Sequence, residues 1–222
     1  MITLHYSPTD ASLAPHLLLN ELGADYTLAL VDRSIQAQKS PRYLKMNPNG
    51  LIPVLEDGQL TIYETAAILM HLADTHVHSG MSPAVGTAER AHYYKWMAWT
   101  SATLHSTLIA YFYGERFVAP GNAEGARQVK QQAESRATAL LAQIESQLQS
   151  HRLPWLLGDS FSAVDPYLLM LGGWTRRFER PASSFRHLGP YLWRLAQRPA
   201  SQAVFALEGI DAAVWLGPRE GA

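Results

Sequence analysis

The fold of this chain is decided by two neighbouring runs, which read NPNGLIPVL at 47–55 and LTIYETAAI at 60–68. The pattern predicts a loop, a short strand, a turn, a second strand and the start of a helix. The first strand passes through Pro53, and proline inside an apolar strand removes a backbone donor from the sheet. We therefore expect a bend or a cis bond between Ile52 and Pro53.

Two parts of this stretch carry groups suited to a peptide ligand. A cis bond would turn the backbone N–H and C=O of Ile52 toward solvent, where they can pair with an extended peptide. Glu64 and Thr65 lie at the predicted helix N-terminus, whose free N–H groups attract a carboxylate. The alternative is a buried hairpin followed by a capped helix, with no ligand.

The first ~75 residues alternate strands and helices. A strand at 2–7 stops at Pro8, a helix that starts near Ala11 or Ser12 runs to Gly23, and a second strand covers 26–31. Strand, helix and strand in this order require a right-handed crossover and a parallel pair.

The second half is predicted to be all-helical. We expect a first domain at 1–78, a linker rich in small and turn residues at 79–86, and a helical domain at 87–222. One long amphipathic run covers 88–113, and apolar residues recur at spacings of three and four around 129–148.

Composition excludes several classes of function. A formal net charge of −1 gives no electrostatic reason to bind nucleic acid. No apolar run approaches the ~18–20 residues that a membrane span needs. The N-terminus shows no basic segment or cleavage site of an export signal, so we expect a cytoplasmic protein.

The chain contains no cysteine, which excludes disulfides, thiolate metal sites and a protein thiol nucleophile. His71, Asp74, His76 and His78 cluster near the linker, but their spacing does not indicate a metal site, and we expect none.

The motifs at 47–68 resemble the glutathione-binding half of the glutathione transferases. The resemblance implies a thioredoxin-like N-terminal domain followed by an all-helical C-terminal domain, an α/β plus all-α fold. It implies that Ile52 and Pro53 bind the cysteinyl backbone of glutathione and that Glu64 and Thr65 bind its γ-glutamyl end. It also implies a homodimer, with glutathione as a co-substrate and no permanently bound cofactor.

The run YSPTDASLAPH at 6–16 is similar to the first strand–helix corner of the bacterial beta class. His105 and the segment 198–209 also match that class. Where the class has a cysteine, this chain has Ala11, so a mixed disulfide with glutathione is impossible.

Three residues are candidates to activate the sulfur of glutathione. Ser12 follows Ala11 and is the first candidate, with Tyr6 second and His105 third. Each has a structural alternative: a helix N-cap for Ser12, a core aromatic for Tyr6 and a partly buried helix histidine for His105.

The remaining site residues follow from the same resemblance. The glycine carboxylate of glutathione needs a cation or an amide, and Gln36 and Lys39 lie nearest to the lysine that the class uses. The pocket for the second substrate is predicted to include Thr9, Asp10, Ala11, Leu108, Ile109, Phe112 and Trp174.

The resemblance implies a detoxifying transferase that adds the thiolate of glutathione to small apolar electrophiles. A non-catalytic binding or regulatory protein of the same fold is the alternative, because Ala11 and the missing lysine weaken the site. A glutathione-dependent isomerase is a third and more distant reading.

Overall fold

A computed structural model describes residues 1–217. The N-terminal domain contains a four-stranded sheet in the order β2-β1-β3-β4, in which β1 and β2 are parallel and the other neighbours antiparallel. The strands are β1 (Ile2–Tyr6), β2 (Tyr26–Leu30), β3 (Val54–Asp57) and β4 (Leu60–Tyr63). The parallel pairing of β1 and β2 confirms the predicted parallel pair.

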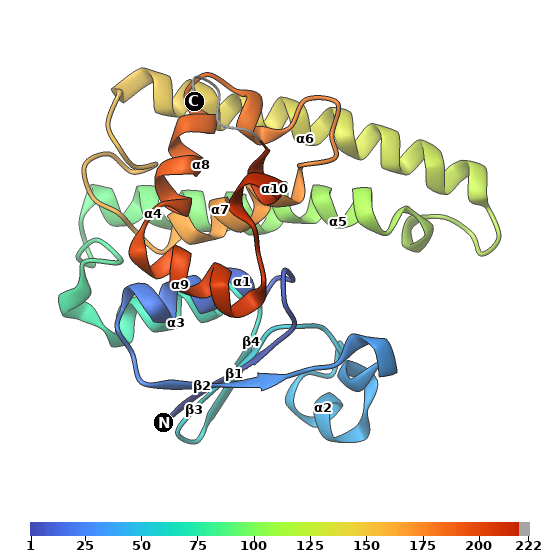
Figure 1. Cartoon of the computed structure of the whole chain (residues 1–222), viewed down its shortest axis with the longest axis horizontal. Coiled ribbons are helices and arrows are strands. Elements are labelled where there is room, and N and C mark those ends of the chain that lie inside the picture. The colour runs from blue at the N-terminus through green and yellow to red at the C-terminus, as the bar shows by residue number, and fades with distance from the viewer. Residues whose placement is uncertain (218–222) are drawn as a thin grey trace.

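Three helices belong to this domain: α1 (Leu13–Glu21), α2 (Pro41–Met46) and α3 (Thr65–Thr75). Helices α1 and α3 lie between the sheet and the helical domain (Figure 1). Their buried leucines and those of the helical domain join in one hydrophobic core. A small separate cluster of Val31, Tyr43 and Val54 lies between α2 and the sheet.

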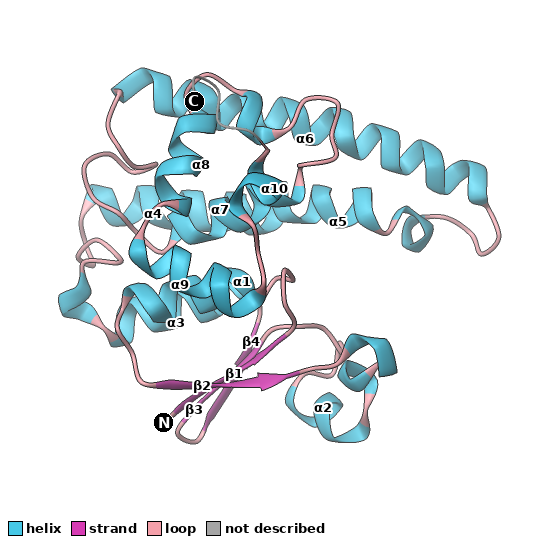
Figure 2. Cartoon of the chain, in the orientation of Figure 1, coloured by secondary structure: helices cyan, strands magenta, loops and turns pink. Residues whose placement is uncertain are grey.

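The rest of the chain is helical, and the strands are confined to one lobe (Figure 2). The helices are α4 (Ala88–Trp99), α5 (Ser106–Phe112), α6 (Ala123–His151), α7 (Val164–Trp174), α8 (Leu188–Ala196), α9 (Pro199–Glu208) and α10 (Ala212–Leu216). The run predicted at 88–113 is formed by α4, a π-helical turn at Thr100–His105, and α5. All eleven residues of α7 are buried, so this helix forms the centre of the domain.

This architecture confirms the predicted fold class, an α/β domain followed by a helical one. Residues 218–222, the end of the predicted helical domain, lie outside the described part of the chain. Within residues 1–217, no helix is both long and apolar enough to cross a membrane.

Candidate functional site

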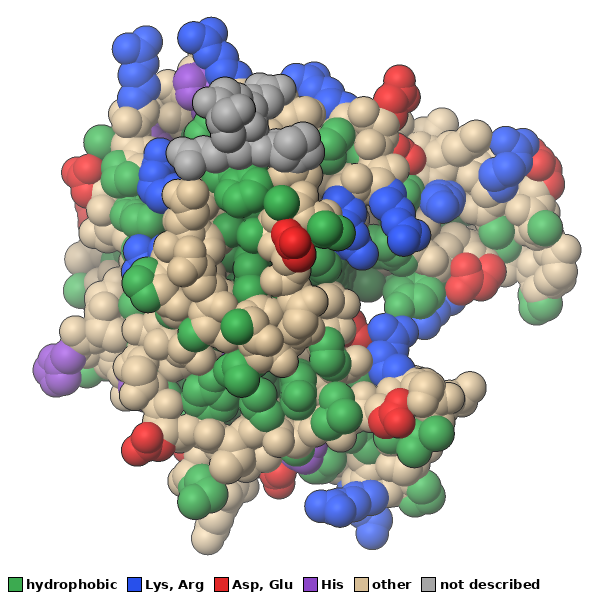
Figure 3. All heavy atoms as spheres, viewed as in Figure 1, with side chains coloured by type: hydrophobic (Ala, Val, Ile, Leu, Met, Phe, Trp, Pro, Cys, Tyr) green, Lys and Arg blue, Asp and Glu red, His purple; other side chains and the backbone are tan. Residues whose placement is uncertain are grey.

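A cleft of about 430 Å³ lies between the two domains. The space-filling view shows it as a hollow on the face drawn, with Lys and Arg side chains around it (Figure 3). One wall comes from the loops at the ends of the strands and from the start of α3. The other wall comes from α5, the end of α7 and the short segments that follow them.

The loop before β3 presents backbone groups to the cleft. The Ile52–Pro53 bond is cis, as expected, and both residues line the cleft. The carbonyl of Leu51 accepts hydrogen bonds from Asn47 Nδ2 at 2.9 Å and from Tyr43 Oη at 3.0 Å, and these bonds fix the loop. Within residues 1–217 the N–H and C=O of Ile52 have no hydrogen-bond partner, so they are available to a ligand.

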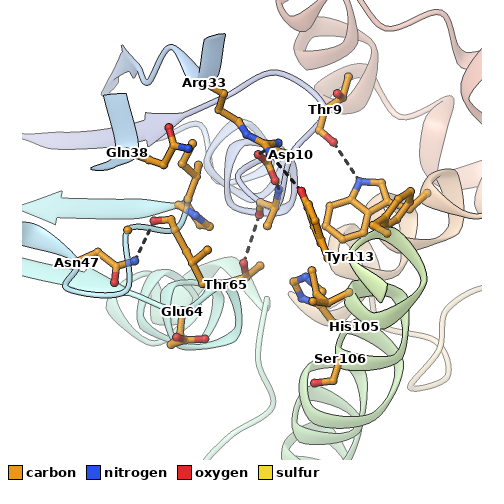
Figure 4. Close-up of a pocket in the computed structure, with 18 of the residues that line it drawn as sticks. Thr9, Asp10, Arg33, Gln38, Asn47, Glu64, Thr65, His105, Ser106 and Tyr113 are labelled. Atoms are coloured by element: carbon orange, nitrogen blue, oxygen red, sulfur yellow. Dashed lines mark hydrogen bonds and ion pairs between the residues drawn. The ribbon is translucent and has the colours of Figure 1, made fainter. Parts of the chain in front are cut away.

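Helix α3 begins at the cleft. Glu64 precedes it with φ +76°, an unusual backbone conformation for a residue with a side chain. Such a conformation costs about 1–3 kcal/mol and is often found where a functional group must be held in place. Thr65 is buried, and its hydroxyl donates to the carbonyl of Ala11 at 3.3 Å. Glu64, Thr65 and the strand–helix corner therefore share one side of the cleft (Figure 4).

The structure places Ser12 away from the cleft. Its side chain is fully buried, and its hydroxyl accepts from Ser7 N at 3.1 Å and donates to Ser7 O at 3.0 Å. It makes no capping bond to α1 either. The hydroxyl closes the corner loop on itself, and this placement counts against Ser12 as the group that contacts the sulfur.

Three other predicted residues also lie outside the cleft. Tyr6 packs on the core with its ring 6.1 Å from that of His16. Gln36 sits exposed in a left-handed turn with φ +54°, which directs the chain so that Gln38 lines the cleft instead. Leu108 is completely buried in the helical core, because it faces inward while its neighbour Ile109 faces the cleft.

The other predicted residues line the cleft: Thr9, Asp10, Ala11, Lys39, Ile52, Pro53, Glu64, Thr65, His105, Ile109, Phe112 and Trp174. Lys39 is partly engaged, because its Nζ donates to the carbonyl of Asn49 at 3.0 Å.

His105 ends the π-helical turn and faces the cleft from the helical wall (Figure 4). Its Nδ1 lies 2.7 Å from Tyr167 Oη. Burial lowers the pKa of His105 to about 4 and raises the pKa of the Tyr167 phenol. The imidazole is therefore neutral near pH 7, and its Nδ1 is paired with the Tyr167 hydroxyl.

A second set of cleft residues has no counterpart in the sequence predictions. Arg33 donates to Asp10 Oδ2 at 2.8 Å and to Tyr113 Oη at 3.0 Å, and so links the two domains across the mouth of the cleft (Figure 4). Arg116 and Arg176 also line the cleft. Arg33 and Arg116 lie in short 3-10 helices and Arg176 in the turn after α7, and these segments are too short for a periodic pattern to indicate which way a side chain points.

The corner loop is held from the helical domain by Glu208 at the end of α9. One carboxylate oxygen accepts the N–H of Thr9 at 2.8 Å and the other lies 2.6 Å from His16 Nδ1. On the same loop, Trp174 Nε1 donates to the carbonyl of Thr9 at 3.0 Å. The segment 198–209 resembles a family segment, but nothing in its sequence indicates this role of Glu208.

Among the described residues, no group of three or more His, Cys, Asp or Glu side chains is arranged to hold a metal ion. The polar groups of the cleft are two carboxylates, hydroxyls, amides, an imidazole, an ammonium group and guanidiniums, which are suited to an organic ligand with charged ends.

Two family models match most of the chain. The model of the glutathione S-transferase N-terminal domain matches residues 2–74, and that of the C-terminal domain matches residues 73–199. A glutathione S-transferase of Xanthomonas campestris pv. campestris is 28% identical, with 94% of this chain and 99% of the relative covered.

Solved structures agree. A glutathione transferase of Methylococcus capsulatus is 33% identical with a TM-score of 0.80, over 94% of this chain and 99% of the other. A sphingomonad glutathione S-transferase complexed with glutathione is 30% identical with a TM-score of 0.79, over 94% of this chain and all of the other.

Proposed function

The chain belongs to the glutathione S-transferase family, and we propose that it binds glutathione in the interdomain cleft and transfers its sulfur to a small, largely apolar electrophile. The observation that carries the proposal is the pairing of two ligand-binding features in one cleft. The unpaired backbone groups of Ile52 and the start of α3 both line it.

Glutathione fits these features from end to end. The N–H and C=O of Ile52 pair with the backbone of its cysteinyl residue. The carboxylate of Glu64 pairs with the α-amino group of the γ-glutamyl end, while the hydroxyl of Thr65 and the first N–H groups of α3 bind the α-carboxylate. Gln38 and Lys39, on the adjoining part of the wall, bind the glycine carboxylate.

The start of α1 and the imidazole of His105 activate the sulfur. A thiol pKa near ~8.5 must fall by about two units for the thiolate to predominate at neutral pH, which requires ~3 kcal/mol. A hydrogen bond to an anion contributes ~1.5–3 kcal/mol, and a helix N-terminus up to ~2 kcal/mol. A hydrogen bond from the imidazole of His105 and the positive end of the α1 dipole together supply this amount without a base.

We propose that the protein acts as a homodimer that packs through the start of the helical domain. Tyr94, on α4, is 45% exposed and offers apolar surface there. Light scattering on the purified protein gives the mass of the particle directly, and a monomer at micromolar concentration would contradict this assembly.

The ultraviolet thiolate band of bound glutathione tests the proposed transfer. We expect the band to appear at about pH 7, below the pKa of the free thiol, and to weaken in His105→Gln. S-methylglutathione, which has no thiol, serves as the control for binding and is measured by calorimetry. Binding without a band and without conjugation would establish the alternative, a glutathione-binding protein without catalysis, which the absence of a side-chain nucleophile at Ala11 favours.

A further inference from the structure

Among the residues that the structure describes, three guanidinium groups line the cleft, and they differ in whether a carboxylate lies close enough to balance their charge. Arg33 is paired with Asp10 at 2.8 Å. Arg116 and Arg176 also line the cleft, yet within residues 1–217 neither has a carboxylate oxygen within 4.0 Å. Two positive charges on the helical wall are therefore not balanced by the protein residues that the structure describes.

Both arginines are held by other contacts. The guanidinium of Arg116 stacks on the ring of Tyr113 at 3.8 Å. That of Arg176 lies 4.7 Å from the centre of the Trp215 ring and donates to the carbonyl of Gly173 at 3.1 Å. Burial and the neighbouring Arg177 lower the pKa of Arg176, as expected for a cation without a counter-charge. Stacked guanidiniums lose less side-chain freedom when they bind an anion.

The position of the two arginines separates them from the groups proposed to bind glutathione. Those groups come from the N-terminal domain, at Gln38, Lys39, Ile52, Glu64 and Thr65. Arg116 and Arg176 belong to the helical wall, where the apolar side chains of Ile109, Phe112 and Trp174 also line the cleft. This wall therefore combines an apolar surface with two cations.

We propose that the second substrate is an anionic electrophile, an apolar ring or chain that carries a carboxylate or sulfonate, and that Arg116 and Arg176 bind this anionic group. The proposal rests on the proposed function, because it names the class of substrate for the same cleft. Guanidinium is suited to the task because its planar N–H groups pair with both oxygens of a carboxylate.

A pair of synthetic substrates tests the preference: 4-chloro-3,5-dinitrobenzoate and its neutral analogue 4-chloro-3,5-dinitrobenzamide. In each, the glutathione sulfur attacks the ring carbon that bears chlorine. A C–S bond forms, the C–Cl bond breaks, chloride leaves with the bonding electron pair and the thiol proton passes to water. Each kcat/KM is divided by the uncatalysed rate constant with glutathione, because the amide activates the ring more strongly than the carboxylate does.

We expect the normalised kcat/KM to favour the benzoate by about tenfold or more, and the preference to shrink with added salt. Arg116→Gln and Arg176→Gln should each reduce this preference about three- to tenfold, mainly by raising the KM for 4-chloro-3,5-dinitrobenzoate. Arg177→Gln removes the same charge one residue away, outside the cleft lining, and should leave the preference within about twofold. Equal use of both substrates, or a loss that appears in the KM for glutathione instead, would overturn the proposal.

Binding without reaction separates this proposal from the proposed transfer. The probe is 3,5-dinitrobenzoate, which has no leaving group, titrated by calorimetry into protein saturated with S-methylglutathione. Binding that is tighter than that of 3,5-dinitrobenzamide and weakened in Arg116→Gln and Arg176→Gln supports the anion site, even if conjugation fails. If the neutral substrate is conjugated and neither assay shows a preference for the anion, the proposed transfer stands and the proposed anion site is overturned.

Discussion

Two buried carboxylates, Asp165 at the start of α7 and Glu208 at the end of α9, organise different parts of the molecule. Asp165 is completely buried and accepts from Ser162 N at 2.7 Å, Ser162 Oγ at 3.0 Å, Leu156 N at 3.3 Å and Tyr191 Oη at 2.6 Å. All of these partners belong to the helical domain. Asp165 therefore holds together the loop before α7, α7 itself and α8.

Glu208 instead joins the two domains. Its partners, Thr9 and His16, belong to the N-terminal domain, and its side chain is also completely buried. Thr9 lines the cleft, so the carboxylate that holds it also positions the wall of the site. The comparison indicates that the helical domain is stabilised independently of the site, whereas the corner loop of the site depends on a contact with the helical domain.

Asp165→Ala is expected to have the largest effect on stability. The substitution leaves four buried donors unpaired, and loss of one partner from a buried charged network costs about 3–5 kcal/mol. Chemical denaturation measures the change in the free energy of unfolding. Ser162→Ala, which removes one of the four donors, should cost only about 1 kcal/mol.

The same variant also tests the comparison. At a temperature where Asp165→Ala remains folded, its affinity for glutathione should stay within about threefold of the wild type, which corresponds to less than ~0.7 kcal/mol. A larger loss would show that the site depends on both carboxylates, and the distinction between the two regions would be lost.

Glu208→Ala should affect both stability and binding. It leaves the part-buried N–H of Thr9 and the buried His16 Nδ1 without their partner, which is expected to cost about 2–4 kcal/mol of unfolding free energy. The freed corner loop should also weaken glutathione binding by about five- to tenfold, which corresponds to ~1–1.4 kcal/mol. Calorimetry and denaturation on the same sample measure the two effects.

Glu208→Gln provides the matched control, because its side-chain oxygen still accepts the N–H of Thr9. Its glutathione affinity should lie closer to the wild type than that of Glu208→Ala. If Glu208→Ala loses stability and keeps full affinity, then the corner loop keeps its shape without the carboxylate.

The partly buried histidine of the helical wall predicts a dependence of stability on pH. Burial lowers the pKa of His105 from 6.5 to about 4, so the unfolded chain binds a proton at pH values where the folded chain does not. The contribution of His105 is complete above the unfolded pKa and is lost as pH falls from 6.5 through 4. The unfolding free energy should fall over this range by up to about 3 kcal/mol more in the wild type than in His105→Gln. Parallel pH profiles of the two proteins would contradict the burial of this imidazole.

The two carboxylates also show how far the sequence predicts the structure. Ser162 and Asp165 are only three residues apart, and Asp165 accepts the N–H of Ser162 at 2.7 Å, so this contact is local in the sequence. The partner of Glu208 on the corner loop is 199 residues away in the chain, and no local pattern indicates it. A contact at that separation follows from tertiary packing alone.

The residues of the cleft show the same contrast between local motifs, which the sequence predicts, and features set by tertiary packing. The proline loop and the acid–hydroxyl pair at 64–65 were predicted as site residues because each is a local motif, and both line the cleft. For Ser12 the sequence gives the residue type and not the direction of its hydroxyl, which here binds Ser7 rather than facing the cleft. Arg116 was missed because its segment has no periodicity.

Tyr113→Phe should have the smallest effect and completes the comparison between buried and exposed contacts. Its hydroxyl accepts from Arg33 Nη2 at 3.0 Å in an exposed place, so it links the two domains as Glu208 does, but in contact with water. Exposed interactions of charged groups contribute about 0–1 kcal/mol, so we expect less than 1 kcal/mol of unfolding free energy and less than about a twofold change in glutathione affinity. The ring that supports Arg116 is retained, which leaves that arginine in place. Because Arg33 also binds Asp10 of the corner loop, an effect as large as that of Glu208→Ala would show that the exposed link at the cleft mouth, rather than the buried carboxylate, controls the position of the corner.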